Sequence, residues 1–172
     1  MKKELRKLLV DLVTHLYEVA KPQVEEKGNY PAVLFVLDKS SPMPKIIDMT
    51  PYADEEDHNL MGTMIKAYQQ APGVLATVLL TEAWALPLDP EIGRKIASGE
   101  IHDDDLPRPS ESPDRQEALF MLVQTPQGDM TAQAFFDRTG GKLKVGPLAI
   151  SPPGVEHRGR LVGEISNFDQ KE

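Results

Sequence analysis

The chain has 172 residues, no cysteine, a net charge of −8 and a pI near 5.0. Chains of roughly 100 to 200 residues usually fold around one core, so we expect a single domain. The missing cysteines exclude disulfides, thiolate metal sites and a cysteine nucleophile. The acidic charge balance argues against a nucleic-acid partner, because phosphate contacts need clustered Lys and Arg.

The N-terminal segment predicts an amphipathic helix. Its apolar residues repeat at helical spacing, and we expect the helix to end at Pro22. This stripe consists of Leu5, Leu8, Leu9, Leu12, Val13, Leu16 and Val19. It can pack on a sheet or form a seam with a second copy of the chain, so a homo-oligomer stays open. Charged residues interrupt the leucines, and no run of about 18 apolar residues occurs, so we predict a soluble, cytoplasmic protein without a signal peptide or membrane span.

Two strands and a second helix are predicted next. Residues 32–38 are a short apolar run rich in strand formers, and residues 45–50 follow as a hairpin partner. Asp54 is a candidate N-cap for a helix whose apolar residues extend to Tyr68. The dipeptide Pro72-Gly73 is expected to end this helix.

The longest predicted strand spans residues 74–85. Alternation places Glu82 and Trp84 on one face of it, together with apolar residues. A long loop rich in proline and acidic residues follows at 86–115, and it contains a short helix that closes at Gly99.

The remaining strands are expected to form a meander. Residues 117–124 and 130–137 are joined by a short turn, and residues 142–150 form a last strand before a polar tail at 151–172. The order α-β-β-α-β-(loop)-β-β-β predicts an α+β fold. We expect an antiparallel or mixed sheet of about five to six strands with both main helices packed on one face.

Glu82 is the first candidate for chemistry. A carboxylate on the apolar face of a strand is costly unless it is paired. Arg115, which follows Asp114 just before the next strand, is the expected partner across adjacent strand ends. The pair can be a structural ion pair that fixes the loop, or it can belong to a ligand-binding site. Trp84 can form the floor of a pocket or fill the core.

A second candidate is the acidic stretch at residues 101–105, which contains His102 and three aspartates. These side chains are a potential ligand set for a divalent ion. The stretch lacks the alternate spacing and the glycine turn of calcium loops, so we interpret it as a solvated loop. We predict no metal site and no cofactor, and we keep His102 as a binding candidate. Signatures of nucleotide binding, zinc proteolysis and the nucleophile elbow are absent from the sequence.

The segment from 74 to 125 carries a resemblance. Its strand ends in Thr81-Glu82-Ala83-Trp84, a proline-rich loop follows, and Pro113-Asp114-Arg115 with Glu117 precedes the next strand. This pattern resembles a group of uncharacterised bacterial and phage proteins. The resemblance implies a bacterial or phage origin, and it implies no activity.

The sequence therefore favours a noncatalytic protein-binding or assembly module. The alternative is a small hydrolase-like enzyme that uses Glu82, Asp114 and His102 around Arg115. An enzyme needs these groups to converge in one concave pocket with a perturbed carboxylate, whereas a binding module can hold them in separate surface pairs.

Overall fold

A computed structural model describes residues 2–52, 58–85, 91, 94–95, 98–101 and 112–151. Two helices and seven strands occur in these residues, which confirms the expected α+β class and element order. The elements are α1 (Lys3–Lys27), β1 (Val33–Asp38), β2 (Lys45–Asp48), a 3-10 turn η1 (Thr50–Tyr52), α2 (His58–Gln69), β3 (Val74–Ala85), β4 (Gln116–Thr125), β5 (Gly128–Asp137), β6 (Lys144–Val145) and β7 (Ala149–Ile150).

The described strands form one antiparallel sheet in the order β2-β1-β3-β4-β5-β6, and β7 also pairs with β5. The β4–β5 hairpin is tight, because Thr125 pairs with Gly128, which has a φ of 122°. The single strand expected at 142–150 is two short strands instead. Pro147 lies between them and has no N–H to donate, while the Gly146 N–H bonds the Phe135 carbonyl at 2.8 Å.

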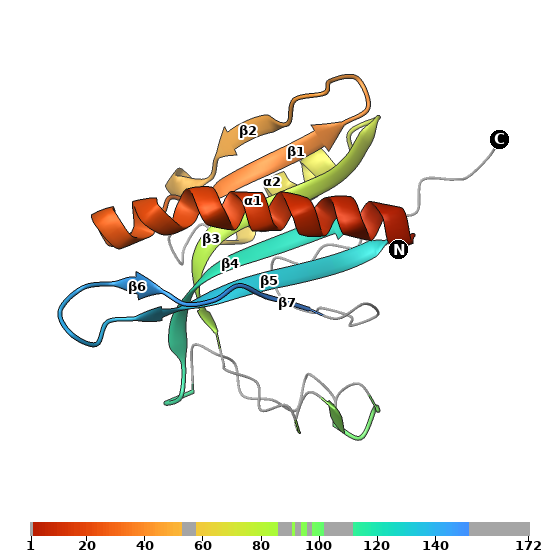
Figure 1. The fold of residues 1–172 in the computed structure, drawn as a ribbon. Helices are drawn as coiled ribbons and strands as arrows, with labels where there is room; N and C mark the ends of the chain where they lie inside the picture. The colour runs from red at the N-terminus through yellow and green to blue at the C-terminus, as the bar shows by residue number, and fades with distance from the viewer. Residues whose placement is uncertain are drawn as a thin grey trace.

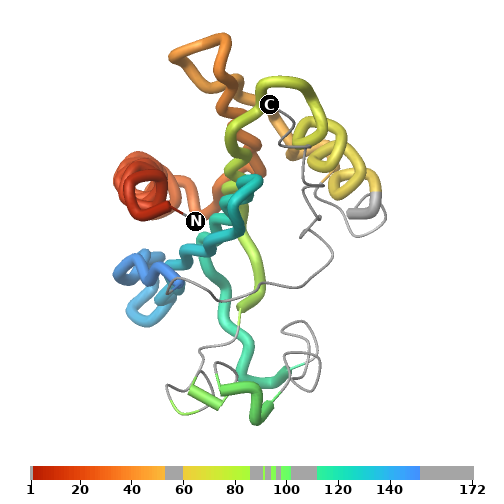
Figure 2. Tube along the Cα trace, turned by 90° about the vertical axis from the view of Figure 1, so that its right-hand side faces the viewer, coloured from red at the N-terminus to blue at the C-terminus, as the bar shows by residue number. Residues whose placement is uncertain are grey.

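Each face of the sheet carries its own helix, so the expectation that both helices pack on one face is wrong (Figures 1 and 2). The core under α1 includes Val78 and Leu80, whereas the core under α2 includes Leu79. Successive residues of a strand point to opposite faces. Because all three residues are apolar and at most 1% exposed, both faces of β3 need a cover.

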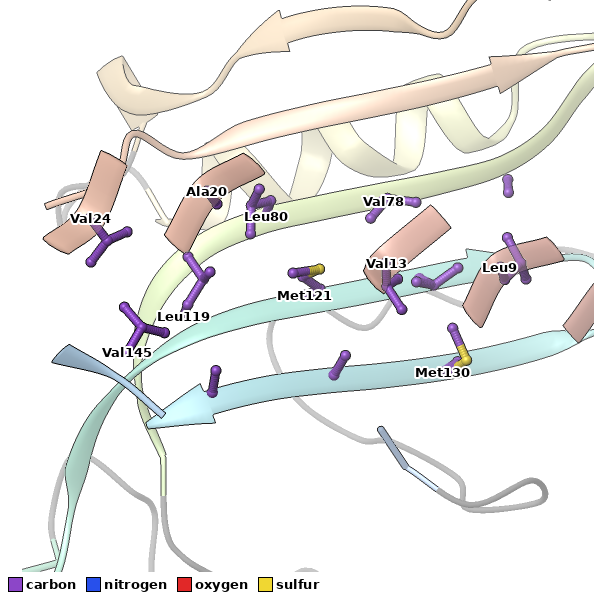
Figure 3. Packing of buried hydrophobic residues seen from close by; sticks show 14 residues of the cluster. Leu9, Val13, Ala20, Val24, Val78, Leu80, Leu119, Met121, Met130 and Val145 are labelled. Atoms are coloured by element: carbon purple, nitrogen blue, oxygen red, sulfur yellow. The ribbon is translucent and has the colours of Figure 1, made fainter. Parts of the chain in front are cut away.

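The helix α1 continues through Pro22 to Lys27, so the expected end at Pro22 is wrong. A proline inside a helix removes one backbone hydrogen bond and favours a bend. Packing offsets this cost, because Val24 in the following turn is fully buried. Gly28 ends the helix in the left-handed region with a φ of 80°, and its N–H bonds the Val24 carbonyl at 2.8 Å. Figure 3 shows the α1 side chains that enter this core, namely Leu9, Val13, Ala20 and Val24.

Side chains of α1 also hold the backbone of the segment from β6 to residue 151. The Arg6 guanidinium donates to the Ser151 carbonyl at 2.6 Å, and the Tyr17 hydroxyl donates to the Gly146 carbonyl at 2.7 Å. Glu25 Oε1 accepts a hydrogen bond from the Val145 N–H at 2.9 Å. One flank of α1 is thus occupied by this segment.

Three of the predicted features fall wholly or mostly outside the described residues. The Asp54 cap, the tail from 152 and most of the loop at 86–115 lie outside the described residues. Within the loop, Lys95 has helical backbone, and its carbonyl accepts a hydrogen bond from the Glu100 N–H at 2.9 Å. Gly99 between them has a φ of 75°, as expected for a glycine that ends a helix. None of the described helices is long and apolar enough to cross a membrane.

Candidate functional site

The candidate site lies where β3 ends and β4 begins. These strand ends form a two-stranded extension that projects away from α1 (Figure 1). The register pairs Glu82 with Leu119 and Trp84 with Glu117, so these side chains share one face of the extension. We call the polar and aromatic residues at this end the strand-end cluster; they are Glu82, Trp84, Arg115, Glu117 and Arg138.

Trp84 and Arg115 form a stacked pair in this cluster. The guanidinium carbon of Arg115 lies 4.7 Å from the centre of the Trp84 ring, which is the geometry of a cation–π contact. Trp84 is 46% exposed, although it is the only tryptophan of the chain. The stack therefore orients a large aromatic side chain at the surface and leaves part of it accessible.

Glu82 is anchored to the connection between α1 and β1. Its Oε1 accepts a hydrogen bond of 2.6 Å from the backbone N–H of Tyr30. Burial raises the pKa of Glu82, and the negative charge of Glu117 adds to this effect. The Tyr30 hydrogen bond and the positive charge of Arg138 act in the opposite direction without reversing it.

The prediction that Glu82 and Arg115 form a contact is wrong. Arg115 precedes the first residue of β4, whereas Glu82 lies opposite Leu119, four residues further along. At about 3.4 Å per residue, this offset separates the two backbones by more than 10 Å. Arg115 therefore stacks on Trp84, and Arg138 is the cation whose charge acts on Glu82.

Glu117 and Arg138 were not predicted as site residues. Arg138 Nε lies 2.6 Å from Glu117 Oε2, and both side chains remain substantially exposed. No local pattern in the sequence indicates that Glu117 and Arg138 meet. Glu117 lies on the strand that follows the Pro113-Asp114-Arg115 turn, and Arg138 follows the last residue of β5, so the pair requires the β4–β5 register.

The other two predicted candidates are placed differently. Asp114 lies in an exposed turn before β4, where its N–H bonds the hydroxyl oxygen of Ser112 at 3.2 Å. His102 and the acidic residues after it lie outside the described residues. The part of the chain that the structure describes contains no group of three or more potential metal ligands.

A second polar group lies under α2, close to the opposite end of β3. The amide nitrogen of Gln69 donates to the Thr77 hydroxyl at 3.1 Å and also to Gln124 Oε1. All three side chains are buried. Gln124 also hydrogen-bonds Asp129, whose pKa is raised by burial and lowered to a smaller extent by this bond. We call these four residues the buried amide network.

Comparisons with protein-family models, curated proteins and solved structures give no match to this chain. The resemblance to bacterial and phage proteins therefore stays a prediction.

Proposed function

We propose that the protein is a noncatalytic protein-binding module of bacterial or phage origin, and that the strand-end cluster is its contact surface. The observation that carries the proposal is the half-exposed Trp84 held by Arg115. Tryptophan and arginine are enriched among the few residues that dominate the free energy of protein–protein binding. A stacked pair also loses less conformational freedom when a partner binds than two independent side chains would.

The charged side chains around Trp84 fit the polar rim that surrounds the apolar centre of a protein–protein interface. Glu117 lies directly opposite Trp84 in the β3–β4 register and is paired with Arg138. Exposed pairs of this kind contribute little to folding stability, but they orient a partner and disfavour wrong partners. The cluster thus combines one aromatic anchor with charges of both signs, as a selective protein interface requires.

The hydrolase-like alternative has one observation in its favour, the raised pKa of Glu82, which would suit a general acid. Hydrolysis would also require Glu82 and Asp114 to meet at one substrate. One oxygen of Glu82 is engaged by a backbone N–H, and Asp114 lies in the exposed turn before β4. This arrangement supports binding better than hydrolysis.

The experiment compares Trp84→Ala with Leu75→Ala, which removes an apolar side chain of similar exposure from the other end of the same strand. Tagged wild-type and variant chains are incubated with extract of the source cells, and recovered proteins are quantified by mass spectrometry. We expect a defined protein to be depleted at least about 30-fold by Trp84→Ala, the change that a loss of about 2 kcal/mol produces, and to be retained by Leu75→Ala.

Arg115→Ala should deplete the same protein, because Trp84 would lose its stacked partner. Thermal unfolding of each variant checks that the fold is intact. Equal recovery with wild type and Trp84→Ala would overturn the proposal. Turnover of a hydrolysable substrate that disappears in Glu82→Gln would favour the alternative.

A further inference from the structure

The apolar stripe of α1 is wider than the surface that the sheet covers. Leu9 and Val13 are at most 2% exposed, whereas Leu8 is 66% exposed and Val19 is 44% exposed. Leu12 is partly buried and lies one turn from Leu8. Residues that are three, four or seven positions apart lie along one line of a helix, so Leu8, Leu12 and Val19 share one flank.

This flank faces the side of the sheet that carries β1 and β2. The opposite flank is occupied by the segment from β6 to residue 151, as the contacts of Arg6, Tyr17 and Glu25 establish. Figure 2 shows α1 against the central strands, with the β1–β2 hairpin extending past it.

The sheet continues the apolar surface at this side. Phe35 and Leu37 of β1 are only partly buried, and Ile46 on the edge strand β2 is 68% exposed. Phe35 pairs with Ile46, so both side chains point to the face that carries α1. We call this region the α1–β2 surface; it consists of Leu8, Leu12, Val19, Phe35, Leu37 and Ile46.

Acidic residues border this surface on both sides. Glu4 and Asp11 lie within one turn of Leu8, and both are exposed. On the sheet side, Asp48 pairs with Val33 and is exposed on the same face as Ile46. Lys7 is also exposed and lies one turn from both Glu4 and Asp11, so these three side chains together carry a net charge of −1. The basic residues Arg6 and Lys21 belong to the other flank of α1, where Arg6 bonds the Ser151 carbonyl and Lys21 lies 5.8 Å from the Tyr17 ring centre.

We propose that the α1–β2 surface binds a basic amphipathic helix of a partner protein. Apolar residues of that helix would contact Leu8, Val19 and Ile46, and its Lys or Arg residues would lie against the acidic borders. A second copy of the chain fits less well, because a two-fold contact would bring the acidic borders of both copies together. An anionic lipid surface is disfavoured for the same electrostatic reason.

This inference extends the proposed function, because it adds a second contact surface built from residues that the strand-end cluster does not contain. A protein with both surfaces would link two partners. Variants of the two surfaces should act independently, so failure of one proposal would leave the other standing.

The test uses a fluorescent 18-residue synthetic peptide with leucines on one helical face and lysines on the other. The control peptide keeps the leucines and carries glutamates in place of the lysines. Fluorescence anisotropy with the full chain should detect binding of the lysine peptide only. We expect Asp11→Lys, and separately the double change Leu8→Ala with Val19→Ala, to weaken this binding at least tenfold.

Matched controls separate a defined surface from general attraction of a basic peptide to an acidic protein. Glu100→Lys changes the net charge as Asp11→Lys does, but it lies in the loop segment far from α1 (Figure 1). Leu60→Ala removes an exposed apolar side chain from α2, which packs on the opposite face of the sheet. Both controls, and Trp84→Ala, should retain the wild-type affinity.

Two results would overturn the inference. Equal weakening by Asp11→Lys and Glu100→Lys would mean that only net charge attracts the peptide. A wild-type dimer in sedimentation analysis that the Leu8→Ala and Val19→Ala double change dissociates would assign the surface to a second copy of the chain.

Discussion

The β3–β4 pair carries two polar groups that differ in burial. In the buried amide network, Thr77 lies directly opposite Gln124, and both are 1% exposed. In the strand-end cluster, Trp84 lies opposite Glu117, and both remain accessible to solvent. The same ladder thus supplies polar groups that fix α2 on the sheet and others that stay available to a partner. Burial, more than residue type, separates the two roles.

The largest effect should come from Gln124→Ala. This change removes the acceptor of the Gln69 amide and the donor to Asp129, and it leaves space in the core under α2. Unpaired buried polar groups and a large-to-small change together should lower the free energy of unfolding by about 2 to 4 kcal/mol. Urea unfolding measures the loss.

The matched control for this prediction is Gln116→Ala, which alters an exposed glutamine on the same strand. It should cost less than about 0.5 kcal/mol. Similar small losses for both variants would show that the amide network contributes little to stability, and the contrast between the two polar groups would fail.

A smaller effect, with a defined sign in pH, is expected for Glu82→Gln. The folded state raises the pKa of Glu82 above its ordinary value of 4.5, because burial disfavours the charged form. Its contribution to stability is therefore fully present below about pH 4.5 and is lost as the pH rises through the folded-state pKa. Glutamine stays neutral throughout, and its side-chain oxygen can still accept the Tyr30 hydrogen bond.

Relative to wild type, Glu82→Gln should thus become more stable as the pH rises from 4 to 7. Urea unfolding at several pH values across this range measures the difference. A variant that instead loses stability relative to wild type with rising pH would show that ionised Glu82 is stabilised by its neighbours, and that Arg138 outweighs burial.

The smallest effect should be that of the ion pair between Glu117 and Arg138. Both side chains are exposed, so water and salt screen their attraction. A double-mutant cycle with Glu117→Ala and Arg138→Ala should give a coupling below about 1 kcal/mol that decreases further at high salt. A coupling above 2 kcal/mol that salt does not change would place this pair with the buried network.

Local patterns were sufficient to predict most of the elements. Alternation along β3 gave the correct face for Glu82 and Trp84, and the spacing in α1 gave the correct helix. The continuation past Pro22 was not predictable, because it depends on Val24 packing against strands that lie far away in the sequence. The placement of the helices on opposite faces was indicated by the apolar run from 78 to 80, but periodicity alone does not say which helix covers which face.

Only the site residues that lie together on one strand could be predicted from the sequence. Glu82 and Trp84 were found because they lie two residues apart on β3. Their contacts depend on the tertiary structure. The Tyr30 N–H that bonds Glu82 comes from the connection between α1 and β1, and Arg115, which stacks on Trp84, comes from the turn before β4. The buried amide network joins Gln69 to Gln124 across 55 residues, and no local pattern in the sequence indicates such a pairing.

The contacts between α1 and the segment that ends at residue 151 bear on protein synthesis. Arg6 and Ser151 are separated by 145 residues, and Glu25 and Val145 by 120. During translation α1 leaves the ribosome well before the strands that bury its apolar face and the backbone that its polar side chains bind. Contacts between distant residues slow folding, because a long loop must close before they form. The leucine-rich N-terminal segment therefore stays exposed to chaperones until nearly all of the described chain has been made.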